Sequence, residues 1–79
     1  MTVTLYTRDG CHLCEAAEQV VREVATGRAT IEIVDIDRDP ALVERYTVRV
    51  PVVAVDGVEV AEFEITREVL LDALRRPPQ

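Results

Sequence analysis

The chain has 79 residues, 48% of them hydrophobic, which suits one domain with a modest core and argues against intrinsic disorder. Its formal net charge is −6, so it lacks the basic surface that non-specific binding to nucleic acid requires. No apolar run approaches the roughly 20 residues of a membrane span, and the first residues lack the pattern of a secretory signal. We therefore expect a single domain over residues 1–79 in the cytoplasm, with reduced thiols and with neither nucleic acid nor membrane as a partner.

The N-terminal part of the chain predicts a strand followed by a helix. Residues 2–7, TVTLYT, are β-branched and aromatic, as strand residues commonly are. Asp9 and Gly10 then predict a turn. From Leu13 onward apolar residues recur at helical spacing, and Gly27 occupies a position typical of a helix C-terminus. The apolar helix positions are Leu13, Ala16, Ala17, Val20, Val21 and Val24.

A second strand and a short helix follow. Residues 30–36, TIEIVDI, have the apolar and β-branched character of a strand. Asp39 is suited to cap the next helix, and Pro40 is suited to its first position. The apolar face of this short helix consists of Leu42, Val43 and Tyr46.

A hairpin is predicted next. Pro51 opens a strand over residues 52–55, and Asp56-Gly57 is a strong signal for a tight turn between antiparallel strands. The partner strand continues over residues 58–63 and carries two glutamates, as edge strands often do.

Thr66 starts a final helix that Pro77 and Pro78 stop, and its inward positions are Val69, Leu70, Leu71 and Leu74. The order is therefore β-α-β-α-β-β-α, which predicts an α/β fold. Its first βαβ unit should be parallel and right-handed. We expect one four-stranded mixed sheet with helices on both faces, the strand over residues 2–7 in a central position and the last strand at an edge.

Cys11 and Cys14 are the only cysteines, and they stand where the first strand gives way to the first helix. At a helix N-terminus Cys11 faces unpaired backbone N–H groups and the positive end of the helix dipole, which favour a thiolate. Cys14 follows one turn later on the same face, sheltered from solvent. Because only a thiolate attacks a disulfide, the pattern predicts Cys11 as the attacking thiol and Cys14 as the resolving thiol.

Two neighbouring residues are candidates for tuning this pair. His12 can carry a proton near the thiolate, and Arg8 adds a permanent positive charge three residues before Cys11. Asp9 and Glu15 act in the opposite direction. We expect Arg8 and His12 to tune the couple; the alternative is that both are solvated surface residues.

A metal or iron–sulfur carrier is a second use for the same thiols. Structural zinc sites take four ligands, usually Cys or His. This chain offers two Cys and one His, so a site within one chain would need carboxylates, and a site shared by two chains stays open. We expect no metal ligands and no tightly bound cofactor. A third alternative is a non-catalytic interaction module.

Three segments together resemble the glutaredoxins of the thioredoxin-fold superfamily: TLYTRDGCHLCEAA, IVDID and VRVPVVAVDG. The Cys-His-Leu-Cys motif in so short a chain is similar to a group of bacterial glutaredoxin-like proteins. The resemblance covers most of the chain, about residues 2–74, and implies a thioredoxin-like fold and a redox-active disulfide. It also implies a cis Val50–Pro51 bond, with Pro51 packed against the cysteines and the Val50 backbone left unpaired to hold an extended substrate.

The segment EFEITRE, residues 62–68, departs from the family pattern. Glutathione-using glutaredoxins have a Gly-Gly pair there, followed by a segment that grips the glutathione carboxylate. Here the glycine pair is missing, and Glu62 and Glu64 would repel a carboxylate. We therefore expect a dithiol–disulfide oxidoreductase that reduces protein or mixed disulfides. Its electron source would be glutathione or a flavoprotein disulfide reductase, with glutathione the less favoured.

Overall fold

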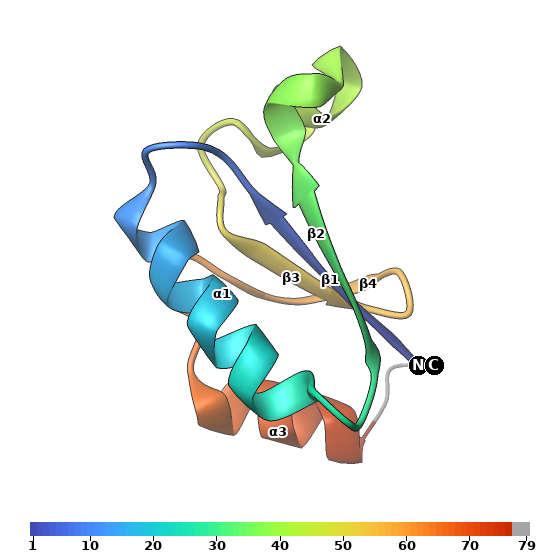
Figure 1. Ribbon diagram of the computed structural model, residues 1–79. Coiled ribbons are helices and arrows are strands. Elements are labelled where there is room, and N and C mark those ends of the chain that lie inside the picture. Colours follow the sequence, from blue (N-terminus) through green and yellow to red (C-terminus); the bar gives the residue numbers. More distant parts are fainter. Residues whose placement is uncertain (77–79) are drawn as a thin grey trace.

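The computed structural model describes residues 1–76, and Pro77 and Pro78, predicted to stop the last helix, lie outside the described residues. Strands and helices follow the predicted order along the chain, with one additional short helix, η1 (Figure 1). The elements are β1 (Thr2–Thr7), α1 (His12–Ala25), β2 (Thr30–Asp35), η1 (Ile36–Arg38), α2 (Pro40–Tyr46), β3 (Val52–Val55), β4 (Val58–Glu62) and α3 (Arg67–Arg75).

The four strands form one mixed sheet in the order β2-β1-β3-β4. β1 runs parallel to β2 and antiparallel to β3, and β3 runs antiparallel to β4. This arrangement confirms the central position of β1 and the edge position of β4. Because β1 leads into α1, the N-terminus of that helix lies at the carboxyl end of a central strand.

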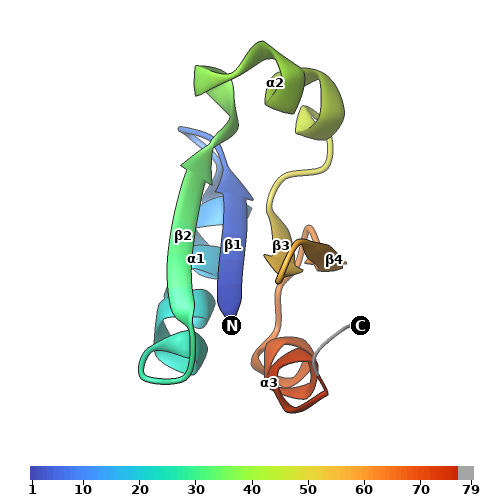
Figure 2. The ribbon, with the colours of Figure 1, turned by 90° about the vertical axis from the view of Figure 1, so that its right-hand side faces the viewer.

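Helices α1 and α3 cover one face of the sheet, whereas α2 lies beyond the carboxyl ends of β1 and β2 (Figures 1 and 2). The main core lies between the sheet and the α1 and α3 helices. Its fully buried members include Val3, Leu5, Val21, Val53, Val55 and Leu70. A smaller core forms where α2 meets the opposite face, from Ile36, Tyr46 and Val52. The alternation of Val52 and Val53 between the two cores follows from the two-residue period of a strand.

The predicted turn and cap residues are confirmed. Asp56 and Gly57 both take positive φ, +49° and +85°, as the tight hairpin turn requires. The side chain of Asp39 accepts the backbone N–H of Ala41 and caps α2, with Pro40 at the first position. Thr66 caps α3 by accepting the N–H of Val69.

Three apolar residues that were predicted to face inward are exposed instead. Leu13 is 50% exposed, Val69 is 40% exposed, and Ala16 also faces solvent. Helix α1 instead buries Cys14, Ala17, Val21, Val24 and Ala25. The helical spacing was correct, and Cys14, Ala17, Val21 and Val24 are buried as predicted; Leu13 and Ala16, at the edge of this face, are exposed instead.

The chain also departs from prediction at the ends of two strands. Ile36 was predicted to end the second strand but begins the 3₁₀ turn η1, where its side chain is fully buried. Phe63 was predicted to continue β4, yet it takes a left-handed φ of +64° just after the strand. An irregularity in the β3–β4 register also falls between Val53 and Ala54.

Among the described residues, no helix has both the length and the apolar character needed to cross a bilayer.

Candidate active site

The two cysteines lie at the first turn of α1. The chain leaves β1, turns at Gly10 with a φ of +75°, and places Cys11 as the N-cap residue of the helix. The Sγ atom of Cys11 accepts the backbone N–H of Cys14 at 3.1 Å. The two residues are joined as a disulfide, with their Cα atoms 5.1 Å apart. A Cys-x-x-Cys pair at a helix start is therefore close enough to alternate between a disulfide and two thiols.

The two sulfur-bearing side chains differ in exposure. Cys14 is buried, with 2% of its surface exposed, whereas Cys11 is partly exposed. An external reagent or disulfide can thus reach Cys11 first, and Cys14 is placed to attack Cys11 from the protein side. The structure brings the two predicted catalytic residues together with the exposure difference that their predicted roles require.

His12 does not lie against the sulfur atoms. Its side chain is 99% exposed, and its Nδ1 atom lies 3.8 Å from a carboxylate oxygen of Glu15. This placement fits the alternative that His12 is a solvated residue at the start of the helix.

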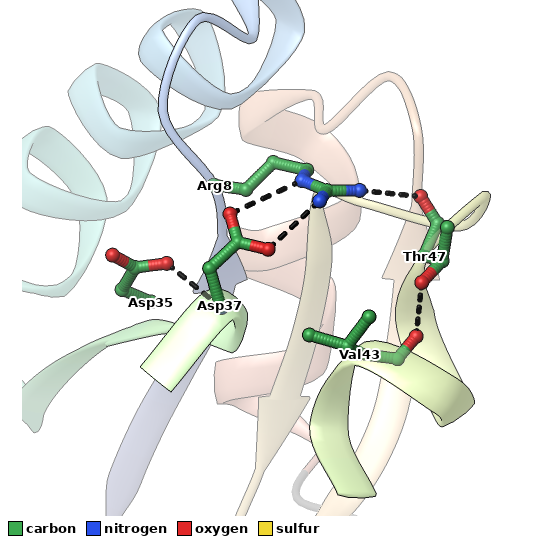
Figure 3. A network of polar contacts seen from close by, with 5 residues as sticks. All are labelled: Arg8, Asp35, Asp37, Val43 and Thr47. Atoms are coloured by element: carbon green, nitrogen blue, oxygen red, sulfur yellow. Dashed lines mark hydrogen bonds and ion pairs between the residues drawn. The ribbon is translucent and has the colours of Figure 1, made fainter. Parts of the chain in front are cut away.

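Arg8 is held by protein partners rather than directed at the cysteines. Its Nε and one terminal nitrogen donate to both carboxylate oxygens of Asp37, at 3.3 and 2.7 Å (Figure 3). The other terminal nitrogen donates to the backbone carbonyl of Thr47 at 3.4 Å. The positive charge that was predicted to act on Cys11 is therefore paired with a carboxylate from η1.

The Val50–Pro51 segment leads from the end of α2 into β3. The peptide bond between these residues is cis, and Pro51 is buried. The Val50 N–H donates to the carbonyl of Tyr46 at 3.2 Å, so the prediction of an unpaired Val50 backbone is wrong for its amide group. The last turn of α2 continues into this segment, and a local helical hydrogen bond takes up the amide. The carbonyl of Pro51 accepts the N–H of Phe63 at 2.8 Å, which ties the start of β3 to the end of β4.

A polar network at the end of α2 was not predicted. The rings of Tyr6 and Tyr46 stack with their centroids 4.5 Å apart, and the Tyr46 hydroxyl donates to Glu59 at 3.2 Å. Arg49 also donates to Glu59 and, at 2.9 Å, to Glu62. Glu62 was predicted to repel a ligand carboxylate, but its own charge is compensated by Arg49. The network fastens α2 to the edge strand β4.

This network shifts the titration of its members. The hydrogen bond from Arg49 lowers the pKa of the Glu59 carboxyl, and it likewise raises the pKa of the Arg49 guanidinium. Burial is the main cause that raises the pKa of the Tyr46 phenol, and its bond to Glu59 acts in the same direction. All three shifts favour the ionisation states that make the observed hydrogen bonds.

A cleft of about 670 Å³ borders Cys14 on the side of β2. Its lining includes the acidic residues Asp9, Glu15, Glu18, Asp35 and Asp39 and the basic residues Arg8 and Arg38. Because carboxylates outnumber guanidinium groups, and one of the latter is paired with Asp37, the cleft disfavours anionic ligands. Within residues 1–76, no three His, Cys, Asp or Glu side chains gather as a metal site would require.

A family model for the glutaredoxin-like domain (DUF836) matches residues 2–75. The chain belongs to this glutaredoxin-like family. The match covers both cysteines, the Val50–Pro51 segment and all four strands. No match was found among the curated proteins.

Solved structures place the glutaredoxin-like chain within the thioredoxin fold. The X-ray structure of the structural-genomics target XcR50 from X. campestris is 34% identical, with 96% of this chain and 99% of that chain covered and a TM-score of 0.81. A mutant thioredoxin from Halobacterium salinarum is 28% identical, with 99% and 74% covered and a TM-score of 0.71. The glutaredoxin-like protein NrdH-redoxin from Escherichia coli is 23% identical, with 100% and 97% covered and a TM-score of 0.64. The last likeness carries the fold alone.

Proposed function

We propose that this glutaredoxin-like protein is a dithiol–disulfide oxidoreductase that reduces protein or mixed disulfides through Cys11 and Cys14. The observation that carries the proposal is the exposure difference within the pair. Cys11 begins α1 and is partly exposed, whereas Cys14 is 2% exposed and lies within disulfide reach. A metal carrier would need further ligands near the thiols, and a purely structural disulfide would not need one sulfur at the surface.

The proposed reaction moves two electrons from the protein to its substrate. The Cys11 thiolate attacks one sulfur of a substrate disulfide, forms a mixed disulfide and releases the other substrate sulfur as a thiolate. The Cys14 thiolate then attacks the Cys11 sulfur, which releases the second substrate thiol and leaves the Cys11–Cys14 disulfide. Unpaired N–H groups at the start of α1 favour the Cys11 thiolate in the first step.

The Val50–Pro51 segment is the proposed wall against which an extended substrate lies. Since the Val50 amide already donates to Tyr46, the Val50 carbonyl is the group that we propose for a strand-like hydrogen bond with the substrate. The proposed interaction therefore uses the Val50 carbonyl alone, rather than the wholly unpaired Val50 backbone that the family resemblance implied.

Electrons must return to the disulfide from a second reaction. We propose disulfide-containing proteins as substrates and a flavoprotein disulfide reductase, rather than glutathione, as the electron source. The acidic lining of the cleft beside Cys14 and the absence of a glycine pair after β4 support this choice. The cytoplasm, whose thiol pool keeps such pairs reduced, stays the proposed location.

A redox titration tests the chemistry directly. The Cys11–Cys14 pair should pass between dithiol and disulfide as one two-electron couple between about −300 and −120 mV, the span of known thiol oxidoreductases. Reduced protein should also cleave the disulfides of insulin, and Cys11→Ser should abolish this activity. Cys14→Ser should instead accumulate a mixed disulfide on Cys11, visible by mass spectrometry. A stoichiometric metal in freshly purified protein, with no redox couple in this range, would favour the carrier alternative.

A further inference from the structure

Arg8 makes contacts to two segments that are far from it in the sequence. Its guanidinium donates to both carboxylate oxygens of Asp37, 29 positions away, and to the carbonyl of Thr47, 39 positions away. Figure 3 shows this side chain lying between η1 and the end of α2. Arg8 itself belongs to the loop that leads from β1 to the cysteines.

Both partners of Arg8 are themselves fixed by local hydrogen bonds. The backbone N–H of Asp37 donates to the side chain of Asp35 at 2.9 Å, which caps η1. The backbone N–H of Thr47 donates to the carbonyl of Val43 at 2.9 Å, and the Thr47 hydroxyl donates to the same carbonyl. Arg8 is therefore attached to anchors that do not depend on the cysteine loop.

These contacts connect the loop that bears Cys11 with the chain segment that leads to Val50 and Pro51. Cys11 follows Arg8 by three residues, and Val50 follows Thr47 by three residues. The Val50 N–H donates to the carbonyl of Tyr46, so the position of Val50 depends on the end of α2 that Arg8 contacts. The Arg8 guanidinium thus links the loop that bears the attacking sulfur to the segment that leads into the proposed substrate wall.

We propose that Arg8 is a positioning residue that sets the Cys11 loop relative to the Val50–Pro51 wall through its fork to Asp37 and its bond to Thr47. This inference rests on the proposed oxidoreductase function. It differs from the view that the Arg8 charge stabilises the Cys11 thiolate. The forked geometry supports positioning, because a planar guanidinium with two bonds to one carboxylate fixes orientation as well as distance.

The two views predict opposite effects of substituting Asp37, the partner of Arg8, on the reactivity of Cys11. If the charge of Arg8 acted on Cys11 directly, Arg8→Gln would lower the thiolate fraction, and Asp37→Asn would raise it by freeing that charge. If Arg8 positions the loop, both substitutions should slow thiol–disulfide exchange. Small misplacements of reacting groups cost large factors in rate, and we expect a loss of about tenfold for each variant.

The experiment measures the rate at which the reduced protein reacts with dithiodipyridine, together with the ultraviolet absorbance of the Cys11 thiolate. Arg8→Gln should lose at least as much rate as Asp37→Asn, because it also removes the bond to Thr47, and the double variant should be no slower than Arg8→Gln. Arg8→Lys keeps the charge but loses the fork, so it should be as slow as Arg8→Gln. A wild-type rate for Arg8→Lys, additive losses in the double variant, or opposite shifts in thiolate absorbance would overturn the inference.

Arg67→Gln is the matched control. It removes another arginine–carboxylate pair between two elements, Arg67 with Glu23 at 2.9 Å, away from the cysteines. It should leave the exchange rate unchanged; an equal loss in this control would contradict a specific role for Arg8. If wild-type protein shows no redox couple, the proposed function fails. If wild-type protein is active and the Arg8 and Asp37 variants keep its rate, only the positioning role fails.

Discussion

The Sγ atom of Cys11 accepts the backbone N–H of Cys14 at 3.1 Å, so the residue that attacks in the proposed reaction is also the N-cap of α1. Serine is a favoured N-cap and can accept the same N–H through its hydroxyl, whereas alanine cannot. The chemical and structural roles of Cys11 can therefore be separated by two substitutions at one position.

Cys11→Ala should be less stable than Cys11→Ser by about 1 kcal/mol, the usual cost of losing a cap. Neither variant can form the disulfide, so the difference reports the cap alone. Urea unfolding of both proteins at neutral pH measures it. Equal free energies of unfolding would show that a side-chain acceptor at position 11 does not stabilise the helix start. Both variants should lack insulin reduction, because neither carries the attacking thiol.

The reduced protein should react with a neutral alkylating reagent at Cys11 at least about tenfold faster than at Cys14. The reason is access: Cys14 is 2% exposed, and a buried thiol is shielded from external reagents. Peptide mass spectrometry after brief labelling gives the ratio. Repeating the labelling in urea should abolish the preference, and equal labelling of the folded protein would contradict the assigned order of attack.

The Glu59 network should make the protein sensitive to acid. The pKa of the folded Glu59 is lowered, chiefly by its hydrogen bond from Arg49. A lowered carboxyl pKa contributes stability above the unfolded value, here 4.5, and the contribution is lost as the pH falls through the folded value. Unfolding midpoints measured between neutral and acid pH should therefore fall less steeply in Glu59→Gln than in the wild type.

At neutral pH Glu59→Gln should itself cost about 1 kcal/mol, since both partners are partly exposed and solvent weakens the pair. Glu64→Gln is a suitable control, because Glu64 is an exposed acidic residue outside this network. If the unfolding midpoint falls equally steeply with decreasing pH in the wild type and in Glu59→Gln, the proposed role of this carboxyl is wrong.

Tyr46→Phe should cost about 1 kcal/mol by removing the hydroxyl that donates to Glu59, while the ring still stacks on Tyr6. Tyr46→Ala should cost more, about 3–5 kcal/mol, because it also empties the smaller core. Thermal or urea unfolding separates the two effects. An unchanged stability for Tyr46→Phe would mean that the hydrogen bond to Glu59 contributes nothing net.

Phe63 provides a test of backbone conformation. Its φ of +64° lies in the left-handed region, which glycine enters freely and alanine does not. Phe63→Gly and Phe63→Ala both remove the ring, so their difference isolates the backbone. We expect the glycine variant to be the more stable by about 1 kcal/mol in urea unfolding. Greater stability of Phe63→Ala would show that the segment relaxes out of this conformation.

The chain order of strands and helices, the caps and the hairpin were predictable because each depends on residues close together in the sequence. Asp39 with Pro40, and Asp56 with Gly57, carry their signals within a few positions. The helical period of α1 was also predictable. The burial of Cys14 was predicted too, but the exposure of Leu13 was not, because the width of the buried face depends on how the helix sits on the sheet.

The residues of the candidate site were likewise predictable only where the signal lies within a few positions of the sequence. The Cys11–Cys14 pair is recognised from its spacing and its place between a strand and a helix. The partners of Arg8 could not be predicted, since Asp37 and Thr47 are separated from it by 29 and 39 positions and no local pattern links them. The same is true of Tyr46 and Glu59, which meet only because β4 pairs with β3.

The sequence by itself determined the thiol pair and the order of the elements, because short-range periodicity and spacing carry that information; three of its segments also carry the resemblance to the glutaredoxins. Tertiary structure alone decided which charges are paired and which backbone groups are free. It assigned Arg8 to Asp37 rather than to Cys11, and it committed the Val50 amide to Tyr46. Hydrogen bonds and ion pairs act over a few ångströms, so their partners are chosen only when the fold brings distant segments together.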